Sequence, residues 1–191
     1  MMEEVSRKKL LSWAILLFCI SLLCFTAVIL PSYKVFAVNI EPDERGIVIT
    51  SYQSPRHNKI LEPGWHFMIP GERVQIYDIS PQTYTMLSPD SIRAKTLDGK
   101  EIFVETSIVY AVEPNKVTDL YVKWQNQYED GIVRPESRGI TRDVLSKYNA
   151  NETSTQLLQI EQSIVNELKK QLTENFLVLI KFSITAIRDT P

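Results

Sequence analysis

The sequence predicts an α+β fold behind an N-terminal membrane segment, and three features of its order support this prediction. An uncharged apolar run comes first, at residues 10–30. Short alternating runs typical of strands follow up to about residue 112, and amphipathic helices fill residues 114–172. A closing strand is expected at 176–187. Strands that come before helices, rather than alternate with them, are typical of α+β domains.

The apolar run from Leu10 to Leu30 contains no charged residue and only three polar ones. At about 1.5 Å rise per residue it reaches ~31 Å, close to the ~30 Å hydrocarbon core of a bilayer. A helix satisfies its own backbone hydrogen bonds in lipid, so we predict a transmembrane signal anchor. The predicted anchor positions are Leu10, Trp13, Leu16, Phe18, Leu22, Phe25, Ile29 and Leu30.

The basic residues Arg7, Lys8 and Lys9 directly precede this run. The positive-inside rule therefore places the N-terminus in the cytoplasm and the main domain on the far side, in a periplasm, cell exterior or intermembrane space. A cleaved signal peptide is the alternative, but its apolar region would be shorter and a small-residue cleavage site would follow. The sequence favours a retained, single-pass anchor.

Composition limits the chemistry of the remaining chain. From Pro31 onward it has 18 Lys and Arg against 21 Asp and Glu, a balance that does not suggest nucleic-acid binding. The two cysteines, Cys19 and Cys24, both lie in the apolar run, so the main domain has no disulfide and no thiol nucleophile.

Turn residues divide the first half of the main domain into short apolar runs. Strands are predicted at 47–52, 65–69, 74–79, 83–87 and 92–96, with a polar loop at 54–59. Asp98–Gly99 predicts a hairpin with a two-residue type I′ turn. The return strand places one alternating set on a single face: Ile102, Val104, Thr106, Ile108, Tyr110 and Val112.

Helices are predicted next. Pro114 suits the first position of a helix that reaches about Trp124. A second helix begins near Tyr128, is kinked or restarted at Pro135, and ends near Tyr148. Its inward residues are predicted to be Ile140, Val144 and Leu145.

A polar break is expected at 149–154, where Thr153 and Gln156 have capping-box spacing. The third helix then carries an apolar stripe of Leu157, Ile160, Ile164, Leu168 and Leu172. The closing strand is expected to place Phe176, Val178, Ile180, Phe182 and Ile184 on one face.

Two surfaces have alternative interpretations. The apolar stripe of the third helix either packs on the protein's own sheet or forms a subunit contact through Leu157, Ile164 and Leu168. Arg134, Arg138 and Arg142 recur every four residues and form a basic ridge. This ridge is either a solvated face with local ion pairs or a surface for self-association or anionic headgroups.

Known catalytic patterns are missing from the sequence. His57 and His66 are the only histidines, and one isolated histidine does not make a metal site. No G-x-S-x-G, P-loop or H-E-x-x-H motif occurs, and Ser107 and Ser183 fall on strands without an evident base. We therefore expect no enzyme activity, no catalytic or metal site and no cofactor.

Several stretches in this order resemble the prohibitin/stomatin/flotillin group, also called SPFH or band 7 proteins. They are DERGIVI (43–49), ILEPGWHFMIP (60–70), DISPQTYTM (78–86) and the whole of 92–148. The chain looks most similar to bacterial prohibitin-like members with one N-terminal anchor. The resemblance implies a curved antiparallel sheet with helices beside it, held against a membrane.

The same resemblance implies a scaffold without catalytic residues that self-assembles and organises or regulates membrane proteins. Expected partners are membrane lipid, the chain itself or a longer relative, and a membrane-bound ATP-dependent protease. The alternatives are a membrane-bound peptidase and a monomeric membrane-surface adaptor. The expected organisation is a basic N-terminus (1–9), the anchor (10–30), a linker (31–42), the SPFH domain (43–187) and the start of a coiled coil (188–191).

Overall fold

The computed structural model describes residues 13, 17–25, 37–50, 55–69 and 71–189. The predicted anchor positions Leu10, Leu16, Ile29 and Leu30 lie outside these residues. Residues 17–25 are helical, and Trp13, Phe18, Leu22 and Phe25 are each more than half exposed. None of the helices in the described part of the chain combines the length and apolarity that crossing a bilayer requires.

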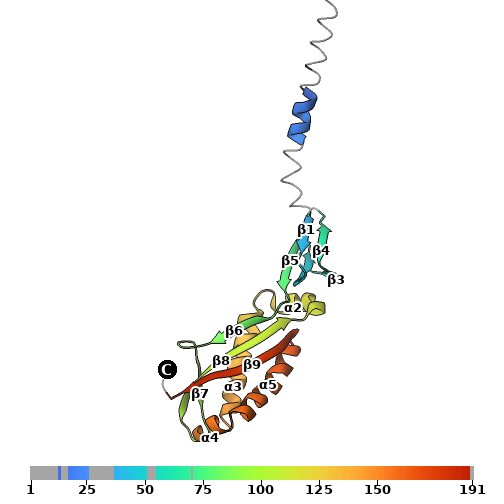
Figure 1. Ribbon diagram of the computed structural model, residues 1–191. Coiled ribbons are helices and arrows are strands. Elements are labelled where there is room, and N and C mark those ends of the chain that lie inside the picture. Colours follow the sequence, from blue (N-terminus) through green and yellow to red (C-terminus); the bar gives the residue numbers. More distant parts are fainter. Residues whose placement is uncertain (1–12, 14–16, 26–36, 51–54, 70, 190–191) are drawn as a thin grey trace, which may run out of the picture.

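Residues 37–78 form a unit of two small antiparallel sheets, which we call the N-terminal unit (Figure 1). The first sheet pairs β1 (Ala37–Ile40) with β4 (Gly64–Phe67). In the second sheet, β2 (Glu44–Ile49) lies between β3 (Pro55–Leu61) and β5 (Arg73–Asp78). β3 covers most of the stretch that the sequence predicts as a polar loop, so that prediction is wrong. Backbone pairing with β2 decides its conformation despite the low β-propensity of its residues.

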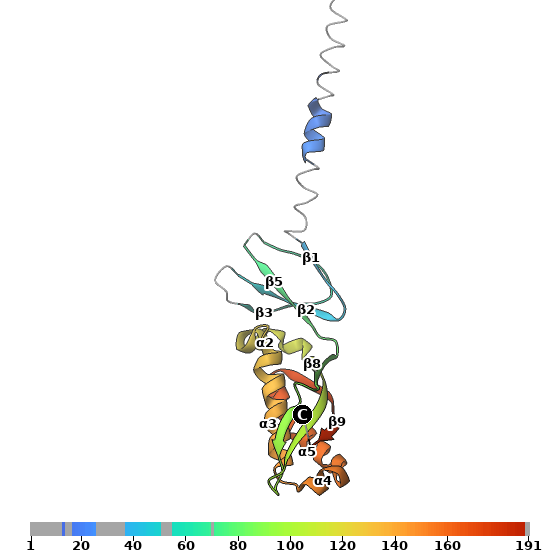
Figure 2. The same cartoon turned by 90° about the vertical axis from the view of Figure 1, so that its left-hand side faces the viewer.

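Residues 79–189 form the C-terminal unit, a four-stranded antiparallel sheet with helices on one face. Its long central strand is β8 (Glu101–Val112), and β9 (Leu177–Arg188) pairs along one edge of it. β6 (Gln82–Met86) and β7 (Ile92–Lys95) share the other edge. Figures 1 and 2 show the helices behind this sheet and its other face open. This mixed fold confirms the predicted α+β class.

The helices follow β8 in chain order. They are η1 (Pro114–Lys116), α2 (Val117–Trp124), the π-helical turn η2 (Glu129–Val133), α3 (Arg134–Leu145), α4 (Ala150–Thr155) and α5 (Leu157–Thr173). Pro114 begins η1 as predicted, and Pro135 restarts the chain as a regular helix directly after the π-helical turn. A proline is tolerated in the first turn of α3 because N–H groups there have no partner within the helix.

The main core joins the sheet to the helices. All six residues of the predicted β8 face are buried, as are Ile160, Ile164, Leu168 and Leu172 of α5. The apolar stripe therefore packs within the protein, against β9 and α3. A second, much smaller core of Ile40, Val48 and Leu61 lies inside the N-terminal unit.

The β7–β8 turn differs from the predicted type I′ turn. Thr96 N–H donates to Lys100 O at 2.9 Å, so three residues form the loop. Among the loop residues only Gly99 has a positive φ, of 82°. This is the three-residue hairpin in which a type I turn is followed by a left-handed glycine. Asp98 Oδ1 accepts hydrogen bonds from Thr96 Oγ1 and from Ala150 N–H, so its side chain ties the turn to α4.

Two further predictions fail near α4. The expected polar break is largely helical, because Asn149 and Glu152, rather than Thr153 and Gln156, form the capping box. Thr153 is buried, and its hydroxyl donates to Ala150 O inside the helix.

β9 keeps the predicted face only in its second half. Leu177 is buried while Val178 and Ile180 are exposed, the reverse of the expected alternation. The pairing with β8 slips by one residue at Ile180 and again at Thr185. Each β-bulge shifts the alternation of side chains by one position, which a strict period of two cannot anticipate. Phe182, beyond the first bulge, is buried as predicted.

Candidate functional site

An apolar strip lies on the outer face of β4 and the residues after it. Trp65, Phe67 and Ile69 are 66%, 86% and 58% exposed, and we call these three residues the aromatic strip. The alternating residue Met68 packs against the small core instead. One face of this strand therefore packs inward, while the large apolar side chains on its other face are exposed to solvent. A contiguous exposed apolar patch of this kind is unusual on the surface of a soluble protein.

The aromatic strip lies where the chain enters the N-terminal unit. Ala37, the first residue of β1, is paired with Phe67, and Asn39 is paired with Trp65. In Figure 1, β1 and β4 form the end of this unit that lies away from α2 and the C-terminal unit. Only a short stretch separates Ala37 from the predicted anchor, which ends at Leu30. The strip therefore lies at the end of the N-terminal unit that is nearest in the sequence to the predicted anchor.

His66 stays a structural residue in this geometry. Its Nε2 lies 2.6 Å from the backbone oxygen of Glu62, so the ring ties the turn before β4 to the strand. His57 lies in β3, and nothing is described of its side chain. Within the described residues, no group of three or more His, Cys, Asp or Glu is placed to hold a metal ion.

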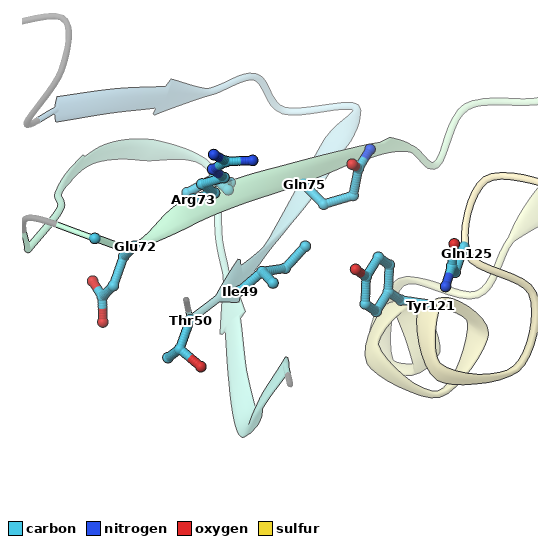
Figure 3. Close-up of a pocket in the computed structure, with 9 residues that line it drawn as sticks. Ile49, Thr50, Glu72, Arg73, Gln75, Tyr121 and Gln125 are labelled. Carbon is cyan, nitrogen blue, oxygen red and sulfur yellow. The ribbon is translucent and has the colours of Figure 1, made fainter. Parts of the chain in front are cut away.

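A polar cleft of about 710 Å³ lies between the N-terminal unit and α2. Figure 3 shows Arg73 and Gln75 on β5 on one side of it, and Tyr121 and Gln125 of the α2 end on the other. Its described lining contains no histidine, cysteine or lysine. The cleft therefore offers hydrogen-bonding groups, among them the Thr50 hydroxyl and the Glu72 carboxylate.

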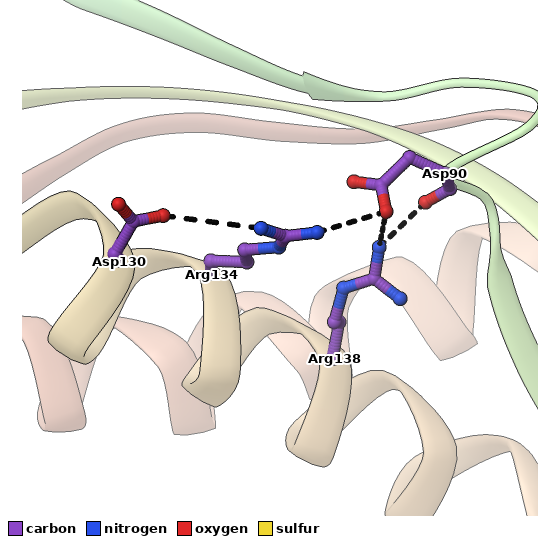
Figure 4. Close-up of polar contacts among 4 residues, drawn as sticks. All are labelled: Asp90, Asp130, Arg134 and Arg138. Carbon is purple, nitrogen blue, oxygen red and sulfur yellow. Dashed lines mark hydrogen bonds and ion pairs between the residues drawn. The ribbon is translucent and has the colours of Figure 1, made fainter.

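The basic ridge of α3 is bound to the protein's own β6–β7 loop (Figure 4). Arg134 Nη2 lies 3.0 Å and Arg138 Nη2 2.6 Å from Asp90 Oδ1, and Arg138 also donates to the Asp90 backbone oxygen. Arg142 Nε donates to Arg93 O at 2.9 Å. The ridge therefore packs against a distant part of the same chain, which neither interpretation of the pattern anticipated, and the Arg134–Asp130 pair at 3.9 Å is the local helix pairing that the first interpretation expects.

Asp90 is the centre of this cluster. Partial burial acts to raise the pKa of its carboxyl, but the hydrogen bond from Arg138 and the charges of both arginines outweigh this and hold the pKa below its ordinary value. Glu-for-Arg reversals on the ridge would remove these contacts. Any effect of such reversals on assembly therefore has to be measured together with the stability of the variant.

The subunit-contact interpretation of the α5 stripe does not describe Ile164 or Leu168, because both side chains are fully buried within one chain. Leu157 is half-buried, whereas its neighbour Leu158 is 82% exposed. The sequence pattern identified the inward face of α5 correctly. Because Ile160, Ile164, Leu168 and Leu172 are buried in the protein's own core, they are not available for a subunit contact.

Ser107 and Ser183 are direct cross-strand partners on β8 and β9, on the side of the sheet away from the helices. Within the described part of the chain neither hydroxyl forms a hydrogen bond to a histidine, lysine or carboxylate. This arrangement gives no support to the peptidase alternative, which requires a base within hydrogen-bonding distance of the nucleophile.

The aromatic strip is the feature that sequence reasoning did not single out as a site. The run Trp65–Ile69 was predicted as a strand with turns at both ends. Trp65, Phe67 and Ile69 occupy every second position of this run, and this spacing was the available signal that one face of the strand is apolar. Whether that face points inward or outward depends on which side of β4 the small core lies.

A profile described as "SPFH domain / Band 7 family" matches residues 38–191. The chain belongs to the SPFH/Band 7 family. Its SPFH domain is 26% identical over 152 residues to Prohibitin-2 of Dictyostelium discoideum, covering 78% of this chain and 49% of that protein.

Two further relatives give the same result. Prohibitin-2 of Gallus gallus is 26% identical over 151 residues, covering 78% of this chain and 48% of that protein. Prohibitin 1 of Drosophila melanogaster is 22% identical over 148 residues, covering 77% and 52% respectively. The chain thus spans about half the length of the curated relatives that it matches. These matches confirm the resemblance drawn from the sequence motifs.

Proposed function

We propose that this SPFH protein is a membrane-bound scaffold without catalytic activity, whose N-terminal unit rests on the bilayer surface beside a single-pass anchor. The aromatic strip carries the proposal, because Trp65, Phe67 and Ile69 are exposed at the end of the N-terminal unit that is nearest in the sequence to the predicted anchor. Tryptophan is enriched at membrane interfaces, where its ring lies at headgroup level with its apolar body toward the acyl chains.

The strip and the anchor act together in this proposal. A single weak membrane contact binds reversibly, whereas a second one close to it orients the domain against the surface. We propose the topology that the basic residues before the anchor predict, with the N-terminus in the cytoplasm and the SPFH domain on the far side.

Fluorescence quenching tests the surface contact directly, because the chain has three tryptophans: Trp13, Trp65 and Trp124. The full chain is reconstituted into vesicles whose lipids carry bromine on the acyl chains, which quenches tryptophans that reach the bilayer. We expect Trp65→Phe to remove part of the quenched emission.

The other two tryptophans supply the controls. Trp13→Phe should also reduce quenching if the anchor is inserted. Trp124→Phe should leave the amount of quenched emission unchanged, because Trp124 is partly buried against the main core and donates a hydrogen bond to Asn175 Oδ1. Emission from Trp65 that is insensitive to brominated lipid would refute the surface contact.

Self-association is the second part of the proposal, motivated by the similarity to prohibitins. The partners would be further copies of this chain or a longer relative, with a membrane-bound protease as a regulated client. The particle mass of the full chain in mild detergent tests it: a species many times the 22.0 kDa protomer is expected. A monomer would contradict self-assembly and favour the adaptor alternative.

A further inference from the structure

The two units meet at a buried joint below the N-terminal sheets. α2 packs against β2 and β3, and the chain crosses from one unit to the other just once, after Asp78. Ile47 and Tyr77 belong to the N-terminal unit, yet they are 1% and 3% exposed and form part of the main core. Beside the polar cleft, the joint therefore has a buried apolar part, unlike the mainly polar contact typical of freely moving domains.

Three tyrosines connect the units inside this joint. The Tyr128 ring lies 6.3 Å from that of Tyr77 on β5 and 6.4 Å from that of Tyr110 on β8, distances typical of packed aromatic pairs. Tyr77 donates to Gln125 O at 2.9 Å, and Tyr110 donates to Glu129 Oε2 at 2.9 Å. Burial raises the pKa of both the Tyr77 and the Tyr110 hydroxyl above its ordinary value, so both remain donors.

The backbone that Tyr77 contacts is strained. Gln125 has φ 51° and ψ −127°, and Gln127 N–H donates to Trp124 O across it at 2.9 Å. These angles are those of the first central residue of a type II′ turn, a position at which glycine is preferred. A residue with a side chain keeps this conformation only where its surroundings hold it there. The Tyr77 hydroxyl is a contact from the other unit that does so.

The strained turn at Gln125 leads directly into η2 and α3. Gly131, in the π-helical turn, lies so close to the Trp124 ring that an added Cβ would be 2.8 Å from it. Gly131 N–H donates to Gln127 O at 2.7 Å, and α3 starts three residues later. Any relaxation at Gln125 would therefore shift the turn that sets the start of α3.

We propose that Tyr77 is a latch by which the position of the N-terminal unit controls the conformation of the α2–α3 connection. With the latch closed, Gln125 is held in its strained turn and η2 stays packed on Trp124. When the N-terminal unit tilts away, the Tyr77 hydroxyl leaves Gln125 O, the turn relaxes and the start of α3 moves. The latch does not depend on the proposed membrane contact, although a unit held at a bilayer would give it a source of tilt.

Hydrogen–deuterium exchange of the full chain in detergent tests the latch with Tyr77→Phe, which removes the hydroxyl and keeps the ring. We expect amides within 125–133 to exchange about fivefold faster, the equivalent of one typical hydrogen bond. Tyr148→Phe is the matched control, since its ring also packs against the main core but lies at the other end of α3. Equal exchange in the two variants would overturn the proposal.

A second substitution separates a latch from an ordinary hydrogen bond. Gln125→Gly keeps the acceptor carbonyl and removes the strain, because glycine adopts positive φ without penalty. In this background the turn no longer needs holding, so Tyr77→Phe should change exchange by less than about twofold. The same fivefold effect in both backgrounds would show that Tyr77 and the strained turn are independent, and the latch would be refuted.

Discussion

The two units of this protein solve the problem of burying apolar surface in different ways. The C-terminal unit covers one face of a long sheet with α3 and α5 and encloses a continuous core. Among the described residues, the N-terminal unit has a separate core of three buried side chains, and two of its other buried residues, Ile47 and Tyr77, are part of its neighbour's core.

This difference shows which unit depends on outside contacts. Small two- and three-stranded sheets rarely bury enough area to be stable alone. The N-terminal unit is stabilised from below by α2, while the aromatic strip on its outer side remains uncovered. This asymmetry supports the proposal that the outer side of the N-terminal unit faces a bilayer.

The largest expected effect comes from breaking the C-terminal core. Leu168 is fully buried on α5, so Leu168→Ala should lower the free energy of unfolding by about 2–5 kcal/mol. Leu158→Ala removes the same atoms from the exposed side of the same helix and should change the free energy of unfolding by less than about 0.5 kcal/mol. Chemical denaturation measures both, and similar losses would mean that the face of α5 is assigned wrongly.

A smaller loss of stability is expected when the N-terminal unit alone is disturbed. A Cβ at Gly46 would lie 3.0 Å from both Ile40 Cδ1 and Val74 Cγ1, so Gly46→Ala should destabilise this unit by about 1–3 kcal/mol. Hydrogen exchange should rise in β1–β5 and stay unchanged in α5.

Gly139→Ala is the control for Gly46→Ala. A Cβ at Gly139 meets no atom within 4 Å, so alanine should stabilise α3 by about 0.5–1 kcal/mol. Faster exchange throughout the chain with Gly46→Ala would show that the two units unfold together.

The smallest effect concerns Asp90 and depends on pH. Its pKa is lowered in the folded protein, so the carboxylate contributes stability above its unfolded pKa and loses that contribution as pH falls through the folded value. Wild type should therefore be more stable than Asp90→Asn at pH 7, and the difference should shrink as the pH falls below the ordinary pKa of an aspartate and through the lowered folded pKa. Thermal melts across this range check the prediction, and a constant difference would exclude the Asp90–arginine contacts as its cause.

Most of the fold could be read from local patterns. The β8 face and the α5 stripe were predicted correctly because each has a long, uninterrupted period, and a helix or strand of that length has one energetically acceptable orientation. The residues of β3 carry no such pattern, since their conformation depends on pairing with β2. Val178 and Ile180 were assigned to the wrong face because a β-bulge changes the phase of the strand.

The features of the candidate site also divide into those that the sequence predicts and those that only the tertiary structure shows. The SPFH/Band 7 family, the apolar run before the domain and the α+β class follow from the sequence, because they depend on the order of motifs and on composition. The tertiary structure alone decided that the arginine ridge binds Asp90, that the aromatic strip faces outward and that Tyr77 reaches Gln125. Each of these depends on distances between residues far apart in the chain, which the packing of the two units fixes and local propensity does not.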